Sequence, residues 1–266
     1  MKKLNKDEVL VLKWCGISAA QILKMDLEAF DKLYHEDPED YKRLLDKANN
    51  LLDKQEALGI ITISCHDPNY PERLKAIGNE APALIHCLGN LELLDKEESV
   101  AVIGARAADK EGLDAAYKLG KEYSEKGYVI VSGLASGCDR SAHEGCLSVG
   151  GKTIAIVGSG LDIVHPTENT ELQMRILEAG GLILSEQLLK QKASPRTLVA
   201  RNRLQAAISK AVILAQCPQK SGSLHTMRFA RNYKKQSLAV EFPKRTEFNA
   251  GNFDLIDKHL ANPIKP

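Results

Sequence analysis

The chain has 266 residues, 44% hydrophobic and 27% charged, which is the composition of a soluble globular protein with one large domain, or one with a small companion. Its 36 basic and 35 acidic residues give a net charge of +1, and no apolar run approaches the ~18 residues of a membrane span. The charged N-terminus lacks an apolar signal segment and the six cysteines form no C-x-x-C pair, so we expect a cytoplasmic protein with reduced thiols.

The charges are unevenly distributed along the chain. Residues 187–240 hold 11 Lys and Arg and no Asp or Glu, whereas residues 61–186 hold 11 basic and 19 acidic residues. Cations that no nearby carboxylate neutralises can attract a negatively charged ligand, and a polyanion is the obvious candidate. The alternative is a solvated basic face that binds nothing.

The first 60 residues are predicted to form a small helical domain of the SAM or helix-hairpin-helix type. Ser18 can cap a helix over 19–24, and Pro38 can open a longer helix over 39–58. Gly59 then ends that helix.

From residue 60 onward, short runs rich in Val and Ile alternate with helix-length segments. Runs that are apolar at every position are typical of a parallel sheet covered by helices on both faces. The expected strands are 60–63, 83–88, 100–103, 129–131, 153–157, 182–184, 211–215 and 237–240. We therefore predict an α/β fold with a Rossmann-like, open and mostly parallel sheet over 61–245, followed by a short polar tail over 246–266.

Four of these strands lead to glycine-containing turns, at 104–106, 132–139, 158–162 and 221–224. In open parallel sheets the ligand crevice lies beyond the carboxyl ends of the strands, where helix N-termini also point. Glycine lets the backbone approach closely and the N–H groups there favour an anion, so phosphate is the expected ligand. The alternative is that these glycines only make tight turns.

Three other motifs do not support an enzyme or a metal site. The Gly-Ser-Gly at 158–160 lacks the third glycine of a dinucleotide fingerprint, and the Gly-Lys-Thr at 151–153 precedes a strand, whereas a P-loop follows one. Cys138, His143 and Cys146 have no fourth ligand at zinc spacing. We expect no catalytic residue, no cofactor and no metal.

Two arginines stand one residue apart in the basic segment, at positions 201 and 203. They point in different directions on a helix, so one can bind a phosphate while the other braces a glycine turn or a carboxylate. The alternative is an internal ion pair, for example of Arg203 with Asp139 or Glu186.

Several of these segments occur together in a fixed order. They are Val-Ile-Gly-Ala-Arg at 102–106, Val-Ser-Gly-Leu-Ala-Ser-Gly-Cys-Asp at 131–139, Gly-Gly-Lys-Thr-Ile-Ala at 150–155, Gly-Leu-Asp at 160–162 with His-Pro at 165–166, Arg-Asn-Arg at 201–203 and Ser-Gly-Ser-Leu at 221–224. In this order they resemble the family of DNA-processing protein A, also called Smf, over roughly residues 1–242.

The resemblance implies an extended Rossmann-like domain after the helical one, and a homodimer that binds and protects single-stranded DNA. It also implies that the protein loads the recombinase RecA onto incoming DNA during natural transformation. Carried over by position, it implies DNA or phosphate contacts from Gly104, Arg106, Ser132, Gly133, Gly137, Arg201, Asn202, Arg203, Lys220, Ser221, Gly222 and Ser223. Asp139, Lys192, Arg196 and Lys210 are expected to support that site.

The chain departs from the family pattern at several points. Leu198 stands where members commonly carry an aromatic residue that would stack on a base, Gln216 where Glu is frequent, and Ala105 where Ser or Thr is usual. Many members also append a winged-helix domain, and we expect none here.

Two other functions fit parts of the pattern. The first is a nucleotide-processing enzyme like the related phosphoribohydrolases, although the stretch equivalent to their catalytic loop, 221–226, has no carboxylate. The second is a protein-interaction scaffold whose basic face meets an acidic partner. Binding assays with single- and double-stranded oligonucleotides separate these three functions.

Overall fold

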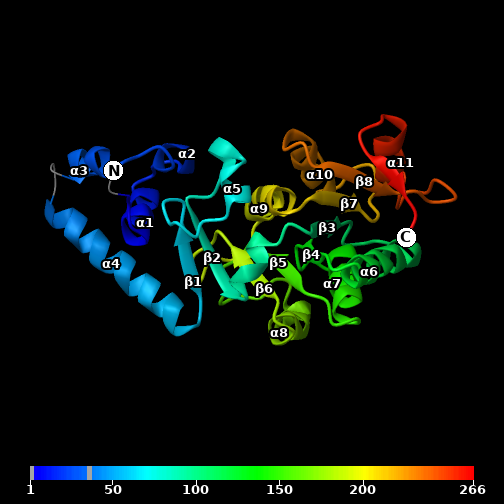
Figure 1. Ribbon diagram of the computed structural model, residues 1–266, viewed down its shortest axis with the longest axis horizontal. Helices are drawn as coiled ribbons and strands as arrows, with labels where there is room; N and C mark the ends of the chain where they lie inside the picture. Colours follow the sequence, from blue (N-terminus) through cyan, green and yellow to red (C-terminus); the bar gives the residue numbers. More distant parts are fainter. Residues whose placement is uncertain (1–2, 35–37) are drawn as a thin grey trace.

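The computed structural model describes residues 3–34 and 38–266, and in this part of the chain nine strands form one sheet (Figure 1). The strands are β1 (Ile61–Ser64), β2 (Leu84–Gly89), β3 (Ser99–Ile103), β4 (Val129–Ser132), β5 (Thr153–Ile156), β6 (Leu182–Ser185), β7 (Ala211–Leu214), β8 (Gln236–Val240) and β9 (Asn262–Ile264). Their order is β1-β2-β6-β5-β4-β3-β7-β8-β9. All neighbours from β6 to β9 run parallel, whereas β2 is antiparallel to both β1 and β6. The predicted mostly parallel α/β fold is confirmed.

Helices cover both faces of this sheet (Figure 1). One face packs against α6 (Lys110–Glu125), α7 (Cys138–Leu147) and α8 (Thr170–Glu178). The other packs against α5 (Glu72–Lys75), α9 (Pro195–Ile208), α10 (Ser223–Asn232) and α11 (Ala250–Asp257). Three short 3-10 helices complete the connections: η1 (Gly78–Glu80), η2 (Leu91–Asp95) and η3 (Thr167–Asn169).

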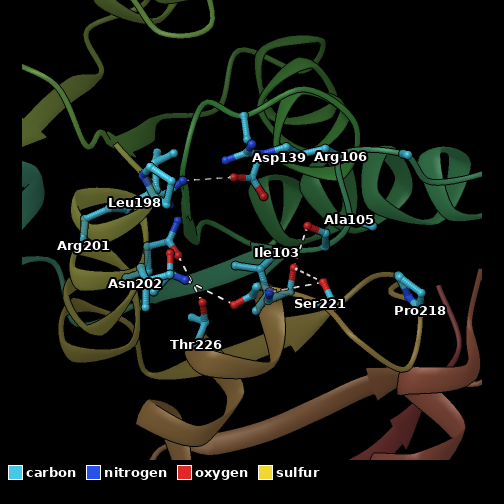
Figure 2. A pocket seen from close by; sticks show the side chains of 18 of the residues that line it. Ile103, Ala105, Arg106, Asp139, Leu198, Arg201, Asn202, Pro218, Ser221 and Thr226 are labelled. Carbon is cyan, nitrogen blue, oxygen red and sulfur yellow. Dashed lines mark hydrogen bonds and ion pairs between the residues drawn. The ribbon is translucent and has the colours of Figure 1, made fainter. Parts of the chain in front are cut away.

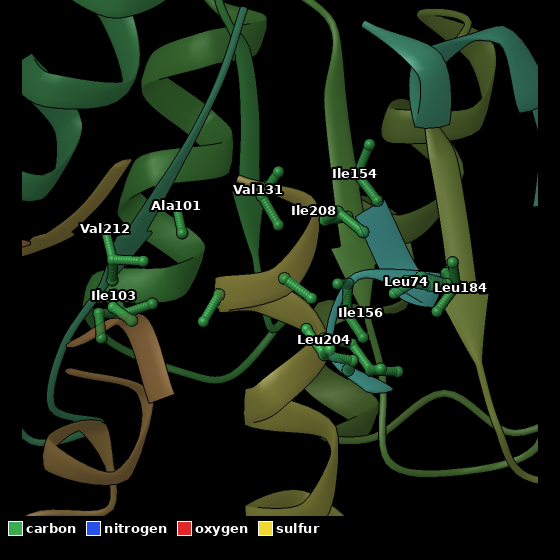
Figure 3. Packing of buried hydrophobic residues seen from close by; sticks show 14 of the residues in the cluster. Leu74, Ala101, Ile103, Val131, Ile154, Ile156, Leu184, Leu204, Ile208 and Val212 are labelled. Atoms are coloured by element: carbon green, nitrogen blue, oxygen red, sulfur yellow. The ribbon is translucent and has the colours of Figure 1, made fainter. Parts of the chain in front are cut away.

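Strand β3 explains why the strand sequences are apolar at successive positions. Val100 and Val102 point into the core under α6 and α7, and Ala101 and Ile103 point into the core under α9 and α10. All four side chains are at most 2% exposed. On the second face, Leu204 of α9 packs near the central strands (Figure 3). Burial on both faces requires the continuous Val- and Ile-rich runs seen in the sequence.

Within residues 3–34 and 38–60, four helices precede the sheet and lie beside its β1 edge (Figure 1). They are α1 (Lys6–Trp14), α2 (Ala19–Ile22), α3 (Leu27–Tyr34) and α4 (Pro38–Ala57). Ser18 caps α2 as predicted, α4 begins at Pro38, and Gly59 ends it with a φ of +73°. Their core includes Leu10 and Phe30 and reaches Leu84 of β2. The division into domains at residue 60 stays a prediction.

The C-terminal segment differs from the expected short tail. It forms α11 and then β9, which pairs in parallel with β8 as the edge of the sheet. Asn252 anchors α11, because its side-chain amide donates to the carbonyl oxygens of Leu214, Ala215 and Val240 while its Oδ1 accepts from Cys217 N. The segment therefore belongs to the sheet layer and shapes the carboxyl ends of β7 and β8.

Two properties of the described ranges bear on function. No helix within residues 3–34 and 38–266 has the length and apolar character needed to cross a bilayer. The same residues contain no cluster of three His, Cys, Asp or Glu side chains that could hold a metal ion.

Candidate functional site

A cavity of about 480 Å³ lies at the carboxyl ends of β3, β4 and β7 (Figure 2). The chain runs outward from β3 through β4, β5 and β6, then returns to place β7 on the other side of β3. Such a reversal of strand order opens a crevice at the carboxyl edge of the sheet. Nine of the predicted site residues line it: Gly104, Arg106, Asp139, Arg201, Asn202, Lys220, Ser221, Gly222 and Ser223.

Helix α9 presents one face to this cavity. Ser194 caps its first turn by accepting a hydrogen bond from Thr197 N at 3.2 Å. Leu198, Arg201 and Gln205 follow at intervals of three or four residues, so they share a face, and all three line the cavity. The wall is therefore apolar at one end and cationic in the middle.

Arg201 forms the buried floor of the cavity. Its Nη2 donates to the carbonyl oxygen of Gly133 at 3.1 Å and lies 3.7 Å from Asp139 Oδ2, which in turn accepts a hydrogen bond from Gly133 N at 3.1 Å. A Cβ atom at position 133 would lie 1.8 Å from Arg201 Nη1, so only glycine fits there. Arg201 thus braces the turn after β4 and pairs with a carboxylate, and its charge is held in place by both contacts.

Burial affects the protonation of this pair. It raises the pKa of Asp139 and lowers the pKa of Arg201, and in each case the partner's charge acts in the opposite direction. Within the described residues, Arg201 Nε and Gln205 Nε2 are buried donors without a hydrogen-bond partner. Both groups belong to residues that line the cavity, and both can only donate, as a ligand rich in acceptor oxygens requires.

The turn after β3 is fixed by contacts to the loop after β7. Gly104 is close to Cys138, and its carbonyl oxygen accepts a hydrogen bond from Ser223 Oγ at 2.7 Å. Gln216 donates from Nε2 to Asp109 Oδ1 at 2.8 Å and accepts from Asp109 N at 3.1 Å. An amide can make both bonds where a glutamate would repel Asp109, which accounts for the glutamine at this position.

Two exposed cations stand at the rim of the cavity, Arg106 and Lys220. Neither makes an ion pair with any residue of 3–34 or 38–266. Arg106 also borders a smaller adjoining cavity of about 130 Å³, lined by Gly133, Ala135, Ser136, His165, Pro166 and Leu198. Cations from three separate segments therefore converge: Arg106 after β3, Arg201 on α9 and Lys220 after β7.

Two predicted cations lie elsewhere. Arg203 points away from the cavity and makes a bidentate ion pair with Glu186, both bonds at 2.6 Å, and its Nε donates to Glu80 O at 2.7 Å. An internal ion pair of Arg203 with Glu186 is the alternative that the sequence analysis gave to phosphate binding. Lys210 precedes β7, so it sits at the amino ends of the strands, where it pairs with Glu98 at 2.8 Å.

Four further predicted residues lie outside the cavity lining. Ser132 is buried and its Oγ donates to Val102 O at 2.7 Å. Gly137 stands behind the turn after β3 with a φ of +76°, a conformation that favours glycine. Lys192 precedes α9 and Arg196 lies in its first turn, and both are exposed. Ser132 and Gly137 thus support the turns that border the cavity. The two cations add positive charge near the cavity without lining it.

Several residues that line the cavity are not predicted from the sequence, among them Gln205, Thr226 and Val199. Gln205 could have been found, because it lies four residues after Arg201 on the same helical face. The others carry no chemical signal of their own, since their role comes from where the fold places them.

The family model described as "DNA recombination-mediator protein A" matches residues 61–266. Among curated relatives, a DNA processing protein DprA of Streptococcus pneumoniae is 40% identical over 179 residues, 67% of this chain and 62% of that protein. A Protein Smf of Synechocystis is 37% identical over 177 residues, 65% of this chain and 44% of that protein. The match thus spans about half the length of these relatives.

Solved structures of two relatives have the same fold. The X-ray structure of DNA processing protein A from S. pneumoniae superposes with a TM-score of 0.76 at 31% identity, covering 98% of this chain and 90% of that one. The structure of the Helicobacter pylori protein, described for its single-stranded DNA binding mode, gives a TM-score of 0.69 at 33% identity, covering 77% and 90%.

Proposed function

The chain belongs to the DNA recombination-mediator protein A family, and from this premise we propose that it binds single-stranded DNA in the cavity at the carboxyl ends of β3, β4 and β7. The observation that carries the proposal is the convergence of Arg106, Arg201 and Lys220, from three distant segments, on one cavity. The H. pylori relative's description as a single-stranded DNA binder agrees with it.

The chemistry of the lining suits a flexible polyanion. Arg106 and Lys220 are exposed and can reach backbone phosphates, and the N-terminal end of α10, which borders the cavity, adds a favourable dipole. Leu198 and Val199 offer apolar surface to bases, although without the stacking of an aromatic ring. The arrangement holds phosphates firmly and reads bases weakly.

Asp139 is the carboxylate of this cavity, and its position argues for binding over catalysis. It is buried, accepts a hydrogen bond from Gly133 N and faces Arg201. A general acid or base must reach the reacting atom of a substrate. Asp139 is engaged in bracing the floor, so the phosphoribohydrolase alternative has no suitable group there.

The cellular role is a further part of the proposal. We infer a cytoplasmic protein that acts as a homodimer, protects incoming single strands and loads the recombinase RecA during natural transformation. Family membership supports this part.

The direct test is fluorescence anisotropy with a labelled oligo-dT of about 20 nucleotides across a salt series. We expect affinity that falls steeply with salt, and about a tenfold loss for Arg106→Ala because one phosphate contact is removed. Lys118→Ala is the matched control, since Lys118 is an exposed cation of α6 outside the cavity, and it should bind like the unmodified protein.

Absence of binding at low salt contradicts the proposal. So does equal loss for Arg106→Ala and Lys118→Ala, because binding would then reflect total charge. Release of base from AMP by the same protein preparation would favour the phosphoribohydrolase alternative.

A further inference from the structure

A second cavity, of about 430 Å³, lies between α10 and α11. Its lining includes the basic side chains of His225, Arg228, Arg231 and Lys258, together with Asp254 and Leu255. None of these four basic side chains lines the first cavity. The cations of the second cavity therefore need a separate explanation.

Arg228, Arg231 and Lys258 make no ion pair with any other residue that the structure describes. Arg228 and Arg231 lie one helical turn apart, and Arg231 Nη1 donates only to the carbonyl oxygen of Met227, at 3.2 Å, among the described residues. Asp254 is already engaged, because it pairs with Arg245 and accepts from Gln219 Nε2 at 3.1 Å. Like charges at this helical spacing repel each other, and a bound anion would relieve that repulsion.

The electrostatics of α10 also favour a bound anion. The pKa of Arg231 is lowered, first by burial and then by the nearby charge of Arg228. A guanidinium that is partly removed from water beside another cation gains most from a phosphate.

The two cavities share a wall. Pro218 and Lys220 line the first cavity, whereas Gln219, between them, lines the second. The first turn of α10 is divided in the same way, with Ser223 on the first cavity and His225 on the second. A polymer that leaves the first cavity past Lys220 therefore has only this loop to cross before it meets the second.

We propose that the second cavity is an additional phosphate subsite for the same DNA strand, with Arg228, Arg231 and Lys258 as its cations. This inference rests on the proposed function of the first cavity. A strand of a few nucleotides fills the first cavity alone, and a longer strand crosses the loop at Gln219 and occupies both. A single strand of nucleic acid fits this arrangement, because it carries repeated phosphates on a flexible backbone and the two cation-lined cavities lie on either side of one loop.

The test compares two lengths of oligo-dT, about 5 and about 20 nucleotides, with the double variant Arg228→Ala/Arg231→Ala. We expect unchanged affinity for the short strand and about a tenfold loss for the long one. The slope of log affinity against log salt should decrease by about 1.4 for the long strand, the value for two lost phosphate contacts on a single strand.

The matched control is Lys118→Ala/Lys121→Ala, which removes two cations at the same helical spacing from α6, on the other face of the sheet. It should leave both affinities unchanged. Arg228→Gln/Arg231→Gln keeps the aliphatic stems, and it replaces the alanine variant if that one does not fold by circular dichroism.

Three results overturn the inference. In the first, the arginine variant binds the long strand as well as the unmodified protein does. In the second, its affinity for the short strand falls as much as its affinity for the long one. In the third, sedimentation shows that the loss of affinity for the long strand follows from dissociation of an oligomer. If poly-glutamate, but not the long strand, depends on these arginines, the cavity serves an acidic protein partner. Failure of the unmodified protein to bind either strand refutes the proposed function itself, so the two failures are distinguishable.

Discussion

Arg106 and Arg201 bring positive charge to the same cavity in different physical states. Arg201 is 6% exposed and tied to Gly133 and Asp139, whereas Arg106 is exposed and makes no ion pair within the described ranges. A buried ion pair costs several kcal/mol when one partner is removed or displaced, while an exposed cation can be removed at almost no cost to stability. The contacts of Arg201 therefore hold the shape of the site, whereas Arg106 is available to contact the ligand.

Gly133→Ala tests the bracing role of Arg201. The added Cβ would overlap the Arg201 guanidinium and displace it from Asp139, so we expect the free energy of unfolding to fall by about 3 kcal/mol. Urea denaturation measures this. Gly222→Ala is the matched control, because a Cβ there meets nothing within 4 Å and its backbone is helical, so stability should change by less than about 1 kcal/mol. Equal stability of both variants would show that the Arg201 contacts do not hold the turn.

Element by element, the sequence predicts most of the fold. All eight expected strands form, because burial on both faces imposes apolar runs that are visible without coordinates. The ninth strand, β9, was missed, since its three residues include Pro263 and its strand character comes from pairing with β8. The sequence therefore predicts only a short polar tail over 246–266.

The site could be predicted only in part. The glycine turns and Arg106 follow from the rule that ligands bind at the carboxyl ends of parallel strands. The same rule could have placed Lys210 correctly, because it precedes its strand and must lie at the opposite end. Which of Arg201 and Arg203 faces the cavity depends on the rotation of α9, and that rotation is set by packing of Leu204 and Ile208 against the sheet.

Arg203→Ala tests the assignment of this residue to structure. Its bidentate pair with Glu186 joins α9 to the segment after β6, and both side chains are less than 20% exposed. We expect a loss of about 3 kcal/mol in unfolding free energy with oligo-dT affinity changed less than about twofold. Arg43→Ala, which breaks an exposed pair with Asp40 on α4, should cost less than about 1 kcal/mol. A large loss of DNA affinity in a folded Arg203→Ala protein would contradict this assignment.

On the scale of the whole molecule, two buried histidines link separate layers. His86 Nδ1 lies 2.9 Å from both Gln55 Nε2 and Thr62 Oγ1, which connects α4 to β1 and β2. His143 Nδ1 lies 2.7 Å from Thr153 Oγ1, which connects α7 to β5. Burial lowers the pKa of each histidine to about 3. The folded protein therefore keeps both rings neutral while the unfolded chain protonates them near pH 6.5.

Stability should consequently decrease with acidification. The contribution of the neutral histidines is fully present above pH 6.5 and is lost progressively as the pH falls from 6.5 toward 3, at about 1.4 kcal/mol per pH unit for each histidine. Urea midpoints at pH 7, 6 and 5 measure the slope, and His143→Gln should reduce it by about that amount. A slope that His143→Gln leaves unaltered would contradict the role of this histidine.

The buried floor made by Gly133, Asp139 and Arg201 also has a kinetic consequence. These groups are held before any strand arrives, so capture has to immobilise only the side chains at the rim, chiefly Arg106 and Lys220. With so little rearrangement, the association rate is set by diffusional encounter and long-range attraction. Added salt will then slow the encounter between protein and strand, and the lifetime of the complex will report the short-range contacts.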